Sequence, residues 1–542
     1  MIEHYRRIIK DSEKRAEVFI KNQILDKSSQ DYGGVITEGG LVQPKSTIYA
    51  ASTAISLYHN RQSKYFKDEK FYERICMALD YVKRLQREDG TFDYINCNFF
   101  AAPDTAFCLK RLLPSYKLLS ALDEEKSIKL KNEIYEILEK GAHGIIKGGF
   151  HTPNHRWAIA SVLMACYSIT KDEEMRETAL TYLSEGIDCN EYGEYAERSA
   201  GGYNRINNDA MIMLYEETGD EGFLEYVNRN LNMMFTYIEP DGSIFTNNST
   251  RQDRGKKVYL KDYYFEYLYM AHKTNNPDFA AAANKIMDTQ IELELKVSDC
   301  LNLLMSHPEL IEYELLGHGY PENYRKYYKE SGIVRVRRGD TSYSIIENSG
   351  RFLYFQAGAL TASMRIGVTY FDQREFKVQK LEEHENGYVL YYKARGWYYK
   401  PFKEKQETSD WWKMDHSKRE KIYGPDLDII VSVNEIEDGI EVNVKTEGCD
   451  RVPIKLEMCF NEGSSIKSDG FMCEGNAGGF ITAVSGNINV TKGLDAIKVG
   501  PAFAKHNFVG GYAGSETPSK DYFTVFFTDF TNFDHTIIFK KG

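Results

Sequence analysis

The feature that most constrains this fold is a repeat of helical segments with a period of about fifty residues. Up to about residue 310, apolar residues recur at helical spacing, as in 72–86, 155–169 and 205–220. Helices that follow a long loop are predicted to begin near Thr47, Asp104, His155, Arg205 and Tyr259. If these helix pairs close into a ring, they form an (α/α) toroid. Its long loops and inner-helix starts then share one rim, where helix N-termini favour negative charge.

The second half of the chain changes to a period of two. From about residue 331, segments such as 428–445 alternate apolar and polar side chains, which is typical of half-buried strands. Asn386-Gly387 and Asp438-Gly439 are typical of type I′ hairpin turns. Strands without intervening helices predict antiparallel sheets. We therefore predict an (α/α) toroid with the catalytic site over 1–310, a linker over 311–330 and an antiparallel β-sandwich over 331–542.

Composition restricts the possible partners and the compartment. The formal net charge of −12 argues against a general nucleic-acid or anionic-membrane binder. Nine cysteines without CxxC spacing indicate free thiols in a reducing compartment. The charged, amphipathic N-terminus lacks the apolar core of a signal peptide, and no apolar run is long enough to span a membrane. We expect a cytoplasmic protein, and the sequence does not indicate its oligomeric state.

The third long loop, "GGFHTPNHRW" over 148–157, holds the most unusual residues. Asn154 and His155 stand directly at a predicted helix start. Helix capping explains Asn154, because asparagine is a favoured N-cap residue, but it leaves His155 unexplained. His155 is therefore a candidate catalytic residue, and Asn154 is one as well as a cap. His151 has no predicted role.

The fourth and fifth loops add a tyrosine and cations to the same rim. The small residues 199–202 precede Tyr203 and Arg205 at the next inner-helix start, and Glu197 lies just before them. The fifth loop carries Arg251 and Arg254 in a basic run that also suits a solvated loop. On an acidic protein, this basic run favours an anionic substrate. We predict that Arg205, Arg251, Arg254 and Glu197 bind the substrate.

Asparagine, histidine, tyrosine and arginine on one rim suit β-elimination from a uronic acid. The C5 proton lies alpha to a carboxylate, and an amide or guanidinium that binds this carboxylate stabilises the enolate-like intermediate. A neutral histidine or a tyrosinate takes the proton, and a tyrosine hydroxyl protonates the leaving glycosidic oxygen. Such chemistry requires no metal or organic cofactor.

The chain resembles the heparinase II/III-like polysaccharide lyases in four features. These are a helical toroid, the adjacent residues Asn154-His155, a later glycine-rich loop that ends in Tyr203, and a β-domain after the toroid. Toroid-type alginate and oligo-alginate lyases are similar. The resemblance implies that Asn154 binds the substrate carboxylate, that His155 is the base or its partner, and that Tyr203 is the acid. It covers nearly the whole chain in architecture, although the matching motifs are short.

Such lyases often take a further histidine, and sometimes a structural metal, from the start of the β-domain. The candidates His384, His416 and His506 show no ligand spacing, so we predict no metal, and a structural zinc stays a minor alternative. Trp411 and Trp412 could stack on sugar, or they could form a hydrophobic contact between the domains.

Three functions therefore remain open. The first is a lyase for acidic oligosaccharides, exo-acting on imported substrates. The second is a glycoside hydrolase on the same toroid, which would need paired carboxylates from Asp104, Glu194 and Glu197. The third is a non-catalytic carbohydrate-binding protein. The sequence indicates neither the uronate nor the linkage.

Overall fold

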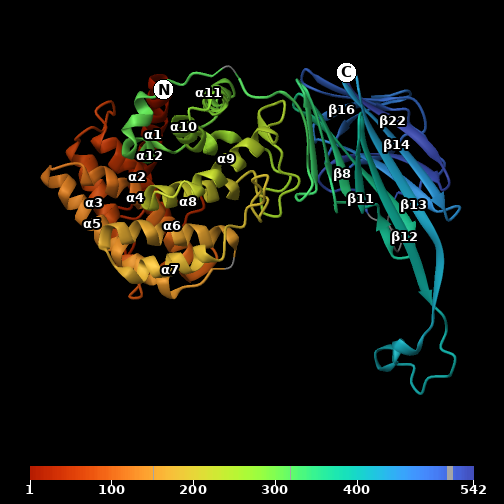
Figure 1. Ribbon diagram of the computed structural model, residues 1–542, viewed down its shortest axis with the longest axis horizontal. Coiled ribbons are helices and arrows are strands. Elements are labelled where there is room, and N and C mark those ends of the chain that lie inside the picture. The colour runs from red at the N-terminus through yellow and green to blue at the C-terminus, as the bar shows by residue number, and fades with distance from the viewer. Residues whose placement is uncertain (151, 318, 510–516) are drawn as a thin grey trace. The chain divides into compact units, whose positions relative to one another are not determined.

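The computed structural model describes residues 1–150, 152–317, 319–509 and 517–542. The chain divides into two compact units, which are described separately. One comprises Met1–Ile238 and Gly242–Pro321, and the other comprises Glu239–Asp241 and Glu322–Gly542. Figure 1 shows helices in the first unit and strands in the second. No helix of the described residues combines the length and the apolar character that a membrane crossing requires.

The first unit consists of helix pairs. One set of helices is buried around most of its circumference, as in α6, where every residue from Trp157 to Cys166 is buried. This set comprises α2 (Pro44–His59), α4 (Ala102–Ser120), α6 (Pro153–Thr170), α8 (Tyr203–Thr218) and α10 (Tyr264–Thr274). These helices begin within a few residues of the predicted positions, and the 3₁₀ turn η1 (Leu260–Tyr263) precedes α10.

The other helices form the outer layer and bury one face. They are α1 (Ile2–Asn22), α3 (Glu69–Leu85), α5 (Glu125–Lys147), α7 (Glu173–Ser184), α9 (Gly222–Phe235) and α11 (Pro277–Glu292). The short helices α12 (Leu301–Ser306) and α13 (Pro308–Glu312) complete the unit. Successive inner helices contact one another, α12 contacts α2 and α4, and α13 contacts α10. The array therefore closes, which confirms the predicted toroid.

Two long loops contain small hairpins. These are β1 (Phe92–Tyr94) with β2 (Asn98–Ala101), and β3 (Ser243–Ile244) with β4 (Val258–Tyr259). Both hairpins lie in segments that directly precede an inner helix. They hold the loops that the sequence places on the rim.

The second unit contains two large sheets. The first has the order β18-β21-β15-β9-β8-β7-β6-β5, with β10 also paired to β9. Its strands are β5 (Asn323–Tyr328), β6 (Ile333–Arg338), β7 (Thr341–Ile346), β8 (Arg351–Ala357), β9 (Leu360–Tyr370), β10 (Gln373–Glu375), β15 (Pro453–Phe460), β18 (Phe480–Thr482) and β21 (Phe523–Phe530). Its one parallel pair among the described strands is β18 with β21. The segment predicted as a linker, 311–330, thus contains a strand, β5.

The second sheet has the order β11-β12-β13-β14-β22-β20-β19-β16-β17, and its pairs are antiparallel. Its strands are β11 (Lys380–His384), β12 (Gly387–Tyr399), β13 (Lys421–Ile436), β14 (Gly439–Gly448), β16 (Ser464–Ser468), β17 (Phe471–Gly475), β19 (Ile488–Lys492), β20 (Asp495–Gly500) and β22 (Asp534–Lys541). Two 3₁₀ turns, η2 (Trp411–Lys413) and η3 (His416–Lys418), lie between β12 and β13.

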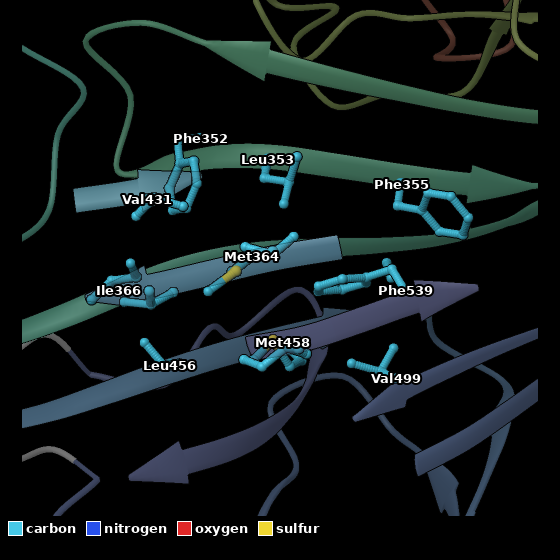
Figure 2. Packing of buried hydrophobic residues seen from close by; sticks show 14 of the residues in the cluster. Phe352, Leu353, Phe355, Met364, Ile366, Val431, Leu456, Met458, Val499 and Phe539 are labelled. Carbon is cyan, nitrogen blue, oxygen red and sulfur yellow. The ribbon is translucent and has the colours of Figure 1, made fainter. Parts of the chain in front are cut away.

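The core of the second unit lies between the two sheets. Phe352 and Met364 of the first sheet pack in one buried cluster with Val431 and Phe539 of the second (Figure 2). Alternate residues of long strands such as β9 and β13 enter this cluster, as the period of two predicts. The sandwich architecture expected from the sequence is confirmed.

Candidate active site

Asn154 is the second residue of α6 and is completely buried. The prediction that it caps the helix is wrong, because the helix begins at Pro153 with Thr152 at the N-cap position, and the Asn154 amide turns to Glu197 instead. The backbone N–H of Asn154 donates to Glu197 Oε2 at 3.1 Å. Its side-chain Nδ2 donates to Glu197 Oε1 and Oε2 at 2.9 and 2.8 Å and to Thr152 Oγ1 at 3.0 Å. The amide hydrogens therefore hold the fourth loop against the third. Asn154 Oδ1 accepts no hydrogen bond from the described residues.

Glu197 joins Asn154 to the cations of the fifth loop. Arg251 Nε lies 3.3 Å from Glu197 Oε1, and the Arg251 guanidinium lies 5.1 Å from the centre of the Tyr203 ring. Burial raises the pKa of Glu197, and the hydrogen bonds from Asn154 and the charge of Arg251 oppose this shift. One carboxylate thus connects Asn154 and Arg251, and Arg251 in turn contacts the Tyr203 ring.

Tyr203 is the first residue of α8 and is partly exposed. Its hydroxyl donates to Gln252 Oε1 at 3.2 Å, and its backbone N–H donates to Ser199 Oγ at 3.1 Å. Asp253 fastens the loop before Tyr203, because it accepts from Ser199 Oγ and from the Gly201 N–H at 2.9 Å each. A Cβ on Gly201 would lie 2.8 Å from Asp253 Oδ2, so any other residue here would displace the Asp253 carboxylate.

His155 follows Asn154 on the first turn of α6 and is partly buried. Its ring lies edge-on to Phe107 of α4, with 5.8 Å between ring centroids. Phe107 also lines a cavity of about 140 Å³ inside the helical unit, and so does Arg205. The His155 side chain thus stands beside both the cavity and the Asn154 cluster.

Arg205 belongs to a second charged group in that cavity. It lies 3.2 Å from Asp209 and 3.5 Å from Glu266, while Lys110 lies 3.5 Å from Asp209. Burial and the charge of Asp209 raise the pKa of Glu266 well above its usual range. The pKa of Asp209 is lowered, because Arg205 and Lys110 outweigh the effect of its burial. Of this pair, Glu266 therefore has the stronger tendency to hold a proton and Asp209 the stronger tendency to be ionised.

The remaining predicted residues belong to the rim loops and to the second unit. Arg254 has an exposed side chain on the fifth loop. Trp411 and Trp412 belong to the other unit and are 56% and 87% exposed. Each carboxylate of the hydrolase alternative has partners. Asp104 pairs with Lys45 at 2.8 Å, Glu194 lies 3.5 Å from Arg198, and Glu197 is held as described.

Sequence reasoning did not identify several residues of the site. Thr152 accepts a hydrogen bond from Asn154, and Gln252 accepts one from the Tyr203 hydroxyl. Asp253 holds the loop before Tyr203. Lys110, Asp209 and Glu266 form the interior charged group. A signal was present for the second set, since charged residues on otherwise apolar inner helices face a cavity or a partner.

The histidines considered for a metal site have other neighbours. His506 Nε2 lies 3.2 Å from the Asp529 carbonyl, and His416 Nε2 lies 2.8 Å from the Trp411 carbonyl. Among the described residues, no three or more His, Cys, Asp and Glu side chains gather as a metal site would require. His151 lies outside the described residues.

Three solved structures share the fold over almost the whole chain. A Paenibacillus xanthan lyase matches with a TM-score of 0.59 and 11% identity, over 99% of this chain and 57% of that one. A Streptomyces coelicolor A3 chondroitin AC lyase, in complex with chondroitin sulphate, matches at 0.56 and 11%, over 99% and 79%. A heparan sulfate lyase from Pedobacter heparinus matches at 0.52 and 10%, over 98% and 83%.

This chain thus spans little more than half the length of the xanthan lyase. No protein-family profile and no curated protein sequence matches it. The fold is nevertheless that of the polysaccharide lyases in which β-sheet domains follow an (α/α) toroid. The fold implied by the resemblance is therefore confirmed.

Proposed function

We propose that this protein is a polysaccharide lyase that cleaves uronic-acid-containing glycans by β-elimination. The observation that carries the proposal is the cluster of Asn154, Glu197, Arg251 and Tyr203 at the N-termini of two neighbouring inner helices. Its donors already hold a carboxylate, that of Glu197. Helix N-termini add to the attraction for a negative charge.

In the proposed reaction, the uronate carboxylate binds at Arg251. It also replaces the Glu197 carboxylate as the acceptor of the hydrogen bonds that the Asn154 side-chain amide donates. A second carboxylate at this place raises the pKa of Glu197 further and favours its protonated form. His155 or ionised Tyr203 removes the C5 proton, the C4–O bond breaks, and the Tyr203 hydroxyl or protonated His155 returns a proton to the leaving oxygen. The product carries a C4–C5 double bond, and no water is consumed.

The cavity beside His155 supports an exo mode of action in this proposal. It is bounded by Tyr49, Phe107 and Arg205 near the starts of inner helices, by Glu216 near the end of α8 and by His307, which follows α12. A glycan end that enters this cavity would position the terminal linkage near His155. We propose oligosaccharides as substrates, and an exo enzyme would release products of one size from the start of the reaction.

The test is to incubate the protein with alginate, polygalacturonate and chondroitin sulfate and to record ultraviolet absorbance and product mass. A lyase produces unsaturated uronates that absorb in the ultraviolet. Saturated reducing ends alone would support the hydrolase, and binding without products would support the carbohydrate-binding protein.

Tyr203→Phe separates these outcomes further. Loss of one positioned acid or base is expected to lower turnover by about 10² to 10⁴-fold. The folded structure should persist, because the Tyr203 hydroxyl makes a hydrogen bond at an exposed position. Gln252→Ala, which removes only the partner of that hydroxyl, is the matched control. Equal turnover of Tyr203→Phe and wild type would exclude Tyr203 from the chemistry.

A further inference from the structure

The strands β12 and β13 continue beyond the sheet to which they belong. Pairing with β11 ends at Tyr391, and pairing with β14 ends at Leu427. The two strands nevertheless remain paired to each other as far as Tyr399 and Lys421. Residues 395–423, here called the aromatic arm, therefore form a two-stranded ribbon with a terminal loop that projects from the sheet (Figure 1).

The aromatic arm contains three of the four tryptophans of the chain, Trp397, Trp411 and Trp412. Trp412 is 87% exposed, Tyr398 70% and Tyr423 60%. An isolated ribbon gains little stability by exposing such side chains to water. This concentration of exposed rings therefore indicates a binding surface.

Cations accompany the rings of the arm. Lys421 Nζ lies 3.9 Å from the Trp397 ring centre, and the Arg419 guanidinium lies 4.7 Å from that of Tyr399. The arm has eight Lys and Arg against five Asp and Glu, so it is net +3 in a chain of net charge −12. Lys405 at the loop is exposed and forms no ion pair with a described residue.

The rings at the loop differ in their exposure. Trp411 packs on His416 with ring centroids 4.4 Å apart, and Trp412 stands at 86° to Trp411. The loop is held by the Trp411–His416 contact and by the hydrogen bond that the Trp412 backbone N–H donates to Asp410 Oδ1 at 3.2 Å. Trp412 is thus presented to solvent on a structured base.

We propose that the aromatic arm binds acidic glycans, in addition to the Asn154 cluster. The choice of a glycan rests on the proposed function. Flat exposed rings stack on sugar faces, and neighbouring cations attract carboxylate or sulfate groups. A protein partner is less well matched, because the cores of protein interfaces are depleted in lysine and glutamate, which are frequent in the arm.

The test measures binding without turnover, in a Tyr203→Phe background of the full chain. Chondroitin sulfate and polygalacturonate are immobilised, with neutral dextran and polyphosphate as comparison surfaces. Trp412→Ala and Lys405→Glu are compared with Leu494→Ala and Lys467→Glu, which replace exposed residues of the same unit outside the arm. Circular dichroism verifies that each variant is folded.

Trp412→Ala is expected to raise the Kd for the acidic glycans by about tenfold or more, as expected for removing a central aromatic contact. Lys405→Glu should weaken binding more strongly at low salt, and the controls should bind as the parent does. Unchanged binding by Trp412→Ala would overturn the proposal, and so would equal binding of polyphosphate, which would indicate attraction by charge alone.

Analytical ultracentrifugation addresses the alternative that the arm binds a second copy of the chain. A dimer that Trp412→Ala dissociates, without change in glycan binding, would also overturn the proposal. Failure of the arm leaves the proposed function intact if unsaturated products form. Conversely, binding by the arm without any products contradicts the lyase and not the arm.

Discussion

At the scale of the residue, Glu197 is the side chain that links the predicted carboxylate-binding residues of the site. It accepts from the backbone and side chain of Asn154 and pairs with Arg251, and its pKa is raised by burial. These contacts suggest two effects of the carboxylate. It positions Asn154, and its charge competes with a substrate carboxylate for the same donors.

Two substitutions separate these effects. Glu197→Gln keeps an acceptor for Asn154 but removes the charge, so KM should fall and should depend less on pH. In the wild type, KM should rise with pH as Glu197 ionises and competes with the substrate. Glu197→Ala leaves buried donors of Asn154 unpaired and should cost about 1–3 kcal/mol of unfolding free energy.

The measurements are steady-state kinetics from pH 5 to 9 and denaturant unfolding. Glu194→Gln is the matched control, because Glu194 is a buried carboxylate of the same loop and accepts from Tyr237 and Asn248 instead. An identical pH profile of KM in Glu197→Gln and wild type would contradict the competition.

The ion pair of Glu216 with His307 predicts a pH-dependent stability. Burial alone would raise the pKa of Glu216, but the hydrogen bond and charge of His307, together with Lys117, lower it from 4.5 to about 2. Because the folded pKa lies below the unfolded value, the stabilisation is present above pH 4.5 and is lost as pH falls towards 2. The shift corresponds to about 3 kcal/mol.

Glu216→Gln should therefore destabilise the protein most between pH 4.5 and 6.5. The pKa of His307 is raised from 6.5 by Glu216 against the effect of burial, so its contribution is present below 6.5 and is lost as pH rises above the folded value. Urea unfolding at several pH values measures the difference. A constant difference down to pH 2 would show that Glu216 is not ionised in this way.

At the scale of the element, the ends of two inner helices can be compared directly. The C-cap residue that follows α6 is Lys171, with φ of 62°. The C-cap residue that follows α8 is Gly219, with φ of 73°. Both residues adopt the left-handed conformation, which glycine tolerates and lysine does not favour. Because Lys171 is exposed, its backbone strain can be changed without altering the packing of the core.

Lys171→Gly should stabilise the protein by about 0.5–1 kcal/mol, because it relieves the left-handed strain. Gly219→Ala should destabilise it by a similar amount. A Cβ at Gly219 meets no atom within 4 Å, so the left-handed backbone conformation is the one source of the cost. Thermal unfolding of both variants measures the effect. Destabilisation by Lys171→Gly would show that the Lys171 contact with the Tyr167 ring outweighs the strain.

Hydrophobic periodicity was sufficient to locate the inner helices but not their partners. The apolar run from His155 onward predicts the start of α6 two residues late, because proline favours the first helical turn and the helix begins at Pro153. The pairing of Asn154 with Glu197 joins residues 43 positions apart, and no local pattern encodes it. Similarly, β5 lies in a segment rich in tyrosine and charge that resembles a linker.

At the scale of the whole molecule, the chain has two cores. Met458 is completely buried between the two sheets, and Leu112 is completely buried among the helices. Compact units with separate cores often unfold separately. The residue substituted should therefore decide which transition shifts.

Met458→Ala should destabilise the sheet-rich unit by about 2–5 kcal/mol and leave the transition of the helical unit unchanged. Leu112→Ala should have the reciprocal effect. Calorimetry of the full chain, with near-ultraviolet circular dichroism, distinguishes the transitions. An equal shift of a single transition by both variants would show that the chain unfolds as one cooperative system.

The sequence by itself determined the division into a helical half and a sheet-rich half and the approximate starts of the inner helices, because the periods of 3.6 and 2 are local properties of each segment. It also predicted that Asn154, His155 and Tyr203 share one rim, since every repeat returns the chain to the same end of the ring. Only the tertiary structure decided that the Asn154 amide faces Glu197, that Arg205 belongs to an interior charged group, and that Trp412 lies on an exposed arm. The reason is physical: hydrogen bonds, burial and exposure depend on contacts between segments that only closure of the ring and extension of the ribbon bring to their places.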